Sequence, residues 1–183
     1  MKTLLLVLFG AMLYAVPAEA QTRLERQEER KEARETARED RAQRREGRAV
    51  RREREIDSLV QNGEFKFTPR TMQRQPAGQP LPILDAEYGV TVSEDMIDID
   101  LPYLKNNLPP YECTVIDYTI PALANIEVER DKTLWRVKFD TTLFSAANYT
   151  FRFEIYPSGD AVLEIDNTWY NTVRYEGTIY PVY

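Results

Sequence analysis

Apolar and polar side chains alternate along much of residues 63–183. Phe65 and Phe67 are separated by a polar residue, and so are Ile97 and Ile99. A period of two places one side of a strand in a core and the other side in water. The segments predicted to be strands are 65–67, 90–92, 97–101, 125–130, 134–139, 149–155, 161–165 and 172–180.

Short turns separate several of these segments, namely 93–95, 131–132 and 157–160. Tight connections favour antiparallel neighbours. The pattern therefore predicts a mainly β fold, a single antiparallel meander of about nine strands that is either barrel-like or a two-layer sandwich. Three prolines and a glycine in Gln73–Pro82 predict a loop or a broken edge strand there.

Before the strands, the pattern changes to a long charged segment. Residues 23–57 carry thirteen basic and eleven acidic side chains, and they contain no proline and the single glycine Gly47. Arg, Glu, Ala and Gln are good helix formers. We expect one long charged helix, a stalk over residues 21–55, that precedes a β-domain over residues 56–183. Its apolar residues are too few for a coiled-coil seam.

The end of this helix has an apolar face. Ile56, Leu59 and Val60 recur at helical spacing. Gly63 follows, and glycine readily takes the left-handed conformation that ends a helix. We therefore expect the last two turns to pack on the β-domain.

Arginines gather in the second half of the helix. Residues 41–54 carry seven bases and two acids, and Arg44, Arg45 and Arg48 fall on one face. This face is either a solvated part of the stalk or a contact for an anionic surface such as phospholipid, lipopolysaccharide or an acidic protein. Nucleic acid is not expected, because the chain has a net charge of −6 and this face lacks interleaved aromatics.

Residues 1–20 have the organisation of a signal peptide. A basic start precedes an apolar run from Leu4 to Val16, and Ala18 and Ala20 form a small-x-small cleavage site before Gln21. The apolar run falls short of the roughly 20 residues that span a bilayer. The sequence predicts a soluble mature protein in the periplasm of a Gram-negative bacterium or outside the cell, with no transmembrane segment. It is not expected to be a lipoprotein, because the single cysteine is Cys113.

The composition restricts the chemistry. The chain has no histidine, which excludes histidine-based triads and zinc sites with histidine ligands. We expect no cofactor, no metal and no enzymatic activity. Cys113 is interpreted as a small, semi-buried apolar residue, with an intermolecular bridge or a reactive thiol as alternatives.

Two pairs of carboxylates are candidates for catalytic or calcium-binding groups. Asp98 and Asp100 lack the ligand spacing of a calcium loop and are interpreted as a polar strand face. Glu154 and Glu164 could act as acid and base in glycoside hydrolysis. Because Arg152 lies nearby in the sequence, a solvated cross-strand charge ladder is the favoured interpretation, and a hydrolase is kept as an alternative.

Aromatic residues supply the remaining candidates. Trp135 is expected in the core. Trp169 and Tyr170 fall in a predicted turn, where they either stack on sugars, anchor an interface or pack locally over the hairpin end.

Several short motifs, in order, carry a resemblance to a known family. They are Ile56-Asp57-Ser58-Leu59-Val60, Gly63-Glu64-Phe65-Lys66-Phe67, Tyr88–Val92, Asp100-Leu101-Pro102-Tyr103, Tyr149-Thr150-Phe151, Pro157-Ser158-Gly159 and Arg174-Tyr175-Glu176-Gly177-Thr178-Ile179. With its signal peptide and charged helix, the chain resembles domain-of-unknown-function family 4251, exported envelope proteins of Bacteroides-type bacteria. The resemblance carries no activity and no site residue. Trp169, Tyr170 and the region 105–113 depart from it.

Together these observations favour a non-enzymatic periplasmic binding or interaction module. Its partner would be a protein, a glycan or an apolar ligand of the cell envelope. The alternative is a structural or envelope-stress protein that acts through its arginine-rich helix on an anionic surface.

Overall fold

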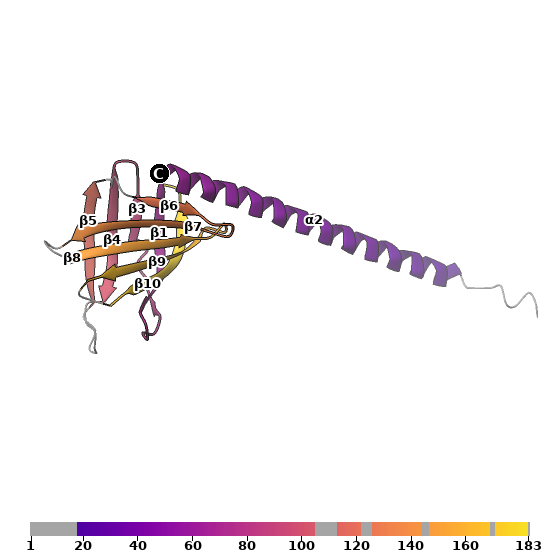
Figure 1. The fold of residues 1–183 in the computed structure, drawn as a ribbon. Helices are drawn as coiled ribbons and strands as arrows, with labels where there is room; N and C mark the ends of the chain where they lie inside the picture. The colour runs from indigo at the N-terminus through magenta and orange to yellow at the C-terminus, as the bar shows by residue number, and fades with distance from the viewer. Residues whose placement is uncertain (1–17, 105–112, 122–125, 144–146, 169–170, 183) are drawn as a thin grey trace, which may run out of the picture. The chain divides into compact units, whose positions relative to one another are not determined.

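The computed structural model describes residues 18–104, 113–121, 126–143, 147–168 and 171–182 (Figure 1). Within them, one helix precedes ten strands. The helix is α2 (Ala18–Asn62), and the strands are β1 (Phe65–Arg74), β2 (Leu81–Pro82), β3 (Gly89–Val92), β4 (Met96–Leu104), β5 (Cys113–Pro121), β6 (Glu127–Arg130), β7 (Trp135–Leu143), β8 (Ala147–Ile155), β9 (Asp160–Asn167) and β10 (Val173–Tyr180).

All of these strands belong to one antiparallel sheet. Its order is β5-β4-β3-β1-β10-β9-β8-β7-β6, and the two-residue strand β2 pairs with β1. Two meanders, β3 to β5 and β6 to β10, are joined where β1 pairs with β10. The mainly β, antiparallel fold preceded by one helix is confirmed, and its form is a curled half-barrel.

Chain connectivity explains why the sheet curls. Strands β5 and β6 stand at opposite ends of the strand order, yet Pro121 and Glu127 are six residues apart in the sequence. Six residues span at most about 22 Å, so the two edges approach each other at this end. Figure 1 shows β3, β4 and β5 running across the direction of β7, β8 and β9.

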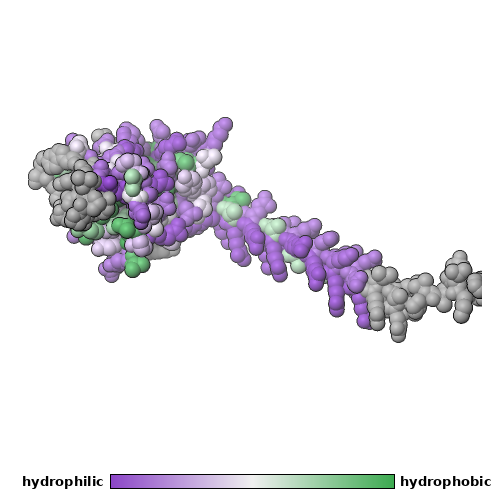
Figure 2. Space-filling view, turned by 90° about the horizontal axis from the view of Figure 1, so that it is seen from below, coloured by the Kyte–Doolittle hydropathy of each residue, from purple (hydrophilic) through white to green (hydrophobic). Residues whose placement is uncertain are grey.

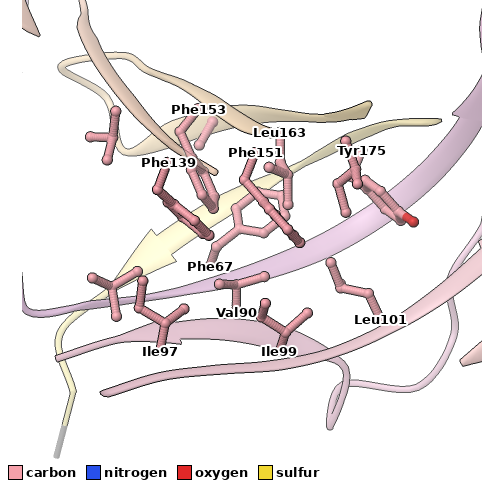
Figure 3. Packing of buried hydrophobic residues seen from close by; sticks show 14 of the residues in the cluster. Phe67, Val90, Ile97, Ile99, Leu101, Phe139, Phe151, Phe153, Leu163 and Tyr175 are labelled. Atoms are coloured by element: carbon pink, nitrogen blue, oxygen red, sulfur yellow. The ribbon is translucent and has the colours of Figure 1, made fainter. Parts of the chain in front are cut away.

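The core fills the space inside this curl. Figure 3 shows aromatic side chains of β7 and β8 facing aliphatic side chains of β3 and β4. The ring of Phe153 meets Phe65 and Phe67 edge to face, with centroids 5.8 and 5.6 Å apart, and Phe139 stacks on Phe151 at 4.8 Å. Among the described residues no charged side chain is buried.

Two buried tyrosines satisfy their hydroxyl groups with backbone oxygens. The hydroxyl of Tyr175 donates to the carbonyl of Pro102 at 2.7 Å, and that of Tyr103 donates to Asn171 at 3.2 Å. Burial raises the pKa of the Tyr175 phenol well above its ordinary value, so it stays protonated and keeps donating at neutral pH.

The helix ends as the sequence predicts. Gly63 has a φ of 67°, and its N–H donates to the carbonyl of Val60. The N–H of Glu64 donates to Leu59, which completes the two hydrogen bonds of a Schellman motif. The expected role of Gly63 is confirmed.

The last turns of α2 are attached to the sheet by apolar and polar contacts. Ile56 and Val60 are fully buried. The guanidinium of Arg52 donates to the carbonyls of Ser158 and Ile179 at 3.3 and 3.2 Å. The expected packing of the helix end on the β-domain is therefore confirmed, and it extends to Arg52.

A second attachment involves Asp57. One of its oxygens accepts the indole N–H of Trp135 at 2.7 Å, and the other lies 2.8 Å from the guanidinium of Arg130. That guanidinium lies over the Trp135 ring, 5.0 Å from its centroid. Trp135 is buried, as expected.

The rest of the helix is solvated. Every side chain from Arg26 to Arg51 is exposed, and Figure 2 shows that this surface is predominantly hydrophilic. No part of the described helix is both long enough and apolar enough to cross a bilayer. The chain divides into two compact units between Arg48 and Ala49. The predicted end of the signal peptide at residue 20 and the predicted end of the stalk at residue 55 stay predictions.

Two expectations need correction. Cys113 is exposed, because it starts the edge strand β5 on the side that faces solvent. The predicted loop at Gln73–Pro82 begins too early, because Gln73 pairs with Arg174 inside the sheet and β1 continues to Arg74. The later part of that segment does contain a broken edge strand, β2.

Candidate functional site

The outer face of strands β6 to β10 carries rows of charged side chains. Alternation along each strand turns every second residue outward, and antiparallel pairing sets these residues side by side. We call this surface the charged face. One row contains Glu127, Lys138, Arg152, Glu164 and Arg174 at directly paired positions across five strands. A second row contains Glu129, Arg136 and Glu154.

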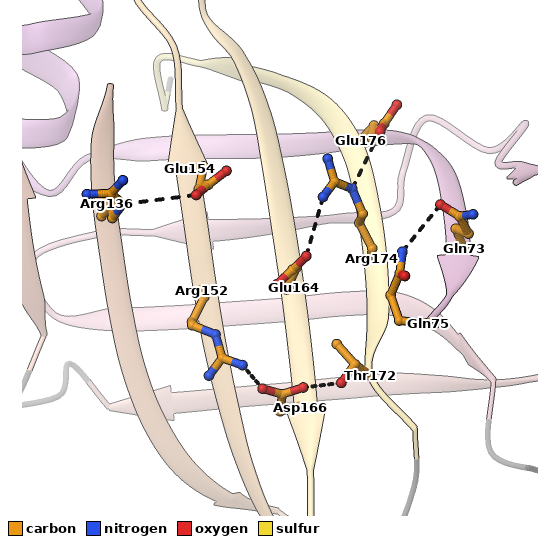
Figure 4. Close-up of polar contacts among 10 residues, drawn as sticks. All are labelled: Gln73, Gln75, Arg136, Arg152, Glu154, Glu164, Asp166, Thr172, Arg174 and Glu176. Carbon is orange, nitrogen blue, oxygen red and sulfur yellow. Dashed lines mark hydrogen bonds and ion pairs between the residues drawn. The ribbon is translucent and has the colours of Figure 1, made fainter. Parts of the chain in front are cut away.

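Ion pairs connect neighbouring strands within this face (Figure 4). Arg174 on β10 lies 3.4 Å from Glu164 on β9, and Arg136 on β7 lies 4.0 Å from Glu154 on β8. Arg174 also lies 3.5 Å from Glu176 on its own strand. Such partly exposed pairs each contribute at most about 1 kcal/mol. The interpretation of Glu154 and Glu164 as members of a charge ladder is confirmed.

The charged face is hollowed by a groove of about 400 Å³. Four carboxylates, four cationic groups and three apolar residues line it, so its formal charges cancel. The lining residues are Glu127, Glu129, Glu154, Glu164, Arg136, Lys138, Arg152, Arg174, Val137, Phe153 and Val162.

Within the groove, Lys138 stands directly opposite Arg152. Like charges at directly paired positions destabilise a sheet. Each cation has its own acidic partner on a different strand: Lys138 lies 3.3 Å from Glu127 on β6, and Arg152 pairs with Asp166 on β9. The pair therefore forms a local concentration of positive charge between two carboxylates.

A second hollow of about 400 Å³ lies farther along the same two strands, lined by Asp140, Thr141, Thr142, Asn148 and Thr150. Two of its three hydroxyl groups are already used: Thr142 donates to Asn148, and Thr150 donates to Asp140. Both hollows lie on the outer face of the sheet, whereas the buried hydrophobic cluster lies on its inner face.

The other half of the sheet carries acidic side chains on its outer face. Asp100 on β4 stands directly opposite Asp117 on β5, and Asp98 accepts a hydrogen bond from Thr119 at 2.7 Å. Partial burial and then the negative charge of Asp117 raise the pKa of Asp100 above 3.8, with smaller contributions from Asp98 and from residues 85 and 87. The described residues contain no group of side chains arranged to hold a metal ion.

Replacing Asp100 with asparagine is expected to raise the melting temperature at pH 7. The folded state holds the Asp100 proton more tightly than the unfolded state, so wild-type stability falls as the pH rises from 3.8 through the raised pKa. The Asp100→Asn variant has no carboxyl group at this position, so it does not lose stability in this pH range. Its higher melting temperature relative to the wild type should disappear well below pH 3.8, where Asp100 is protonated in both the folded and the unfolded state. Thermal unfolding followed by circular dichroism between pH 3 and 8 measures it, with the exposed turn variant Asp95→Asn as control. An advantage that does not change with pH would contradict the electrostatic cause.

The structure separates the residues that the sequence singled out. Ala18, Ala20 and Gln21 are the first residues of the described part of α2, and their assignment as a cleavage site stays a prediction. Arg44, Arg45 and Arg48 are exposed on the helix. Trp169 and Tyr170 lie outside the described residues.

Sequence reasoning singled out Glu154, Glu164 and Arg152 of the charged face but missed the most informative pairing. Lys138 and Arg152 are fourteen residues apart, and nothing in the local pattern places them opposite each other. Likewise, Asp100 was considered with its sequence neighbours, whereas its partner across the strands is Asp117. The register of the hairpins was the missing information in both cases.

The fold and its surface define a class: a curled antiparallel half-barrel with a filled apolar interior and a grooved, charged exterior, preceded by a helix whose last turns pack on the sheet. Residues 48–179 match the family described as "Domain of unknown function (DUF4251)", and the chain belongs to this family. The matched range begins at Arg48 and so includes Arg52 and Asp57, which attach the helix to the sheet.

A solved structure has the same fold. It is the crystal structure of a DUF4251 family protein from Bacteroides eggerthii, with a TM-score of 0.56 and 13% sequence identity. The similarity covers 71% of this chain and 87% of that chain. At this identity the likeness supports the fold alone. No curated protein matches the chain.

Proposed function

We propose that this chain is an exported, non-enzymatic binding module that holds an anionic group of an envelope glycan in the groove of the charged face. The observation that carries the proposal is the direct opposition of Lys138 and Arg152. An anion placed between them relieves their mutual repulsion and accepts charge-assisted hydrogen bonds from both.

The lining of the groove supports recognition rather than catalysis. Glu164 and Glu154 each have an arginine within 4.0 Å, so the two carboxylates of the hydrolase alternative are held in ion pairs. Val162 adds apolar area beside the charges.

Export is supported by residues 1–20, which have the three parts of a signal peptide. A periplasmic or secreted location places the groove among envelope glycans. Expression in a Gram-negative host should give a periplasmic protein whose first residue is Gln21 by N-terminal sequencing. A protein that retains Met1 would contradict export through cleavage.

A titration with acidic and neutral oligosaccharides of equal length, followed by ¹⁵N NMR of the chain from Gln21, tests the ligand. We expect acidic sugars alone to shift the amide signals of β7, β8 and β9. The variant Lys138→Gln/Arg152→Gln should weaken binding at least about tenfold, by loss of two charge-assisted contacts.

The control Arg70→Gln/Lys132→Gln removes the same net charge outside the groove and should bind like the wild type. Both its residues are exposed. Equal weakening by the two variants would mean that only net charge matters. Shifts confined to other strands, or no shifts, would contradict the groove as the site. Binding of acidic peptides in place of sugars would assign a protein partner.

The helix offers a second candidate function, contact with an anionic surface. The exposure of Arg44, Arg45 and Arg48 favours it, because exposed guanidinium groups can pair with anionic groups of a surface. Sedimentation with vesicles of anionic phospholipid should be lost in the variant Arg44→Glu/Arg45→Glu/Arg48→Glu. Unchanged sedimentation would reject the helix as the contact.

A further inference from the structure

Strand β5 is a long and regular edge of the sheet. All nine of its residues pair with β4 in one uninterrupted register, from Cys113 opposite Leu104 to Pro121 opposite Met96. In the described part of the chain no backbone hydrogen bond joins β5 to another element. Its second side therefore presents a row of N–H and C=O groups that could pair with another strand.

The opposite edge, β6, is built differently. It has four residues, Glu127 to Arg130, and all of them are exposed. A short, charged edge strand discourages pairing. Strand β5 has one charged residue, Asp117, within nine. The contrast points to β5 as the edge that accepts a partner.

The two sides of β5 specify what a partner strand must present. Toward the core lie Ile116 and Ile120, which are buried, and Tyr118, which is partly buried. A partner would continue this apolar row with apolar side chains at alternate positions. Toward solvent, Asp117 continues the row that includes Asp100.

The acidic row formed by Asp100 and Asp117 favours a partner with basic side chains. Asp100 and Asp117 have no ion pair within 4.0 Å among the described residues. Partial burial and then the nearby carboxylates raise the pKa of Asp100. A basic side chain opposite Asp117 would neutralise this row. A second copy of the chain, paired antiparallel about Asp117, would instead place four carboxylates in line.

We propose that the β5 edge binds an extended peptide segment in which apolar residues alternate with lysine or arginine. The segment adds an antiparallel strand to the sheet, with its basic side chains beside Asp117 and its apolar side chains over Ile116, Tyr118 and Ile120. This site is separate from the groove on β6 to β10, so neither proposal depends on the other.

Three capped nine-residue peptides test the site by fluorescence anisotropy with the chain from Gln21. One alternates lysine and valine, one alternates glutamate and valine, and the third is the lysine–valine peptide with every backbone nitrogen methylated. We expect binding of the first alone, because charge selects it and methylation removes its N–H donors. Hydrogen exchange should slow at β5 amides and stay unchanged at β6.

The variant Asp117→Lys should weaken binding of the lysine–valine peptide about tenfold and allow the glutamate–valine peptide to bind. Glu94→Lys is the matched control, because Glu94 is exposed in the turn between β3 and β4. It should leave the affinity unchanged. If Asp117→Lys fails to fold, Asp117→Asn should still weaken the lysine peptide and leave hydrogen exchange on β5 in the free protein unchanged.

Four results would overturn the proposal. They are no binding at about 1 mM peptide, equal binding of the methylated peptide, protection at β6 in place of β5, and equal affinity in the Asp117 variants. Concentration-dependent dimers with protected β5 amides at neutral pH would assign the edge to a second copy instead.

Discussion

Replacing Phe153 with alanine is expected to lower the free energy of unfolding by about 3–5 kcal/mol. Its ring is 1% exposed and contacts three other rings: Phe65 and Phe67 edge to face, and Phe139 at 6.4 Å. These partners come from β1 and β7, so the ring connects the two halves of the sheet across the core. Alanine would leave a cavity between β8 and β1, which lie in different parts of the sheet and do not pair with each other. Urea unfolding followed by tryptophan fluorescence measures the loss.

The matched control is Glu154→Ala, one residue farther along the same strand. Glu154 faces solvent, and its pair with Arg136 is 4.0 Å long. An exposed substitution of this kind changes stability by about 0.5 kcal/mol or less. If the two variants lost similar stability, Phe153 would not be the central contact of the core.

Replacing Gly177 with alanine is expected to cost about 3 kcal/mol, the upper end for an overpacked site. A methyl group at this position would lie 2.2 Å from the carbonyl oxygen of Thr68 and 2.9 Å from Pro69 Cα. Both are backbone atoms of β1, which cannot turn away as a flexible side chain would. The register between β1 and β10 is already irregular here, between Pro69 and Thr71. The substitution should therefore weaken the one pairing that joins the two meanders.

Gly47→Ala is the control for this variant. Gly47 lies in the solvated part of α2, and a methyl group there would have no atom within 4 Å. Alanine is a better helix former by about 1 kcal/mol. Circular dichroism should show more helix and an unchanged unfolding midpoint of the sheet. A Gly177 variant as stable as the wild type would mean that β1 and β10 lie farther apart than described.

Local features of the fold could be predicted because they depend on local patterns. The period of two located the strands, since each has one buried side. The apolar residues Ile56 and Val60 and the stop at Gly63 located the end of the helix. Trp135 was assigned to the core for the same reason: its strand alternates.

The strand order could not be predicted. Nothing near Phe65 or Tyr175 indicates that the first long strand pairs with the last, because that pairing depends on packing between residues more than 100 positions apart. The candidate sites depend on the same information. Lys138 meets Arg152, and Asp100 meets Asp117, only in the register that the assembled sheet imposes. Cys113 was misplaced because the sequence does not say which strand is an edge.

The position of β10 also governs when the sheet can form. Strand β10 is the last strand along the described chain, yet it lies between β1 and β9 in the middle of the sheet. A chain that lacks β10 contains two sets of strands, β1 to β5 and β6 to β9. No strand joins these two sets by hydrogen bonds, because β10 is the strand that pairs with both β1 and β9. Pairing of such distant segments is also slow, because a long loop must close first. The aromatic interior therefore stays accessible until β10 has paired with both β1 and β9.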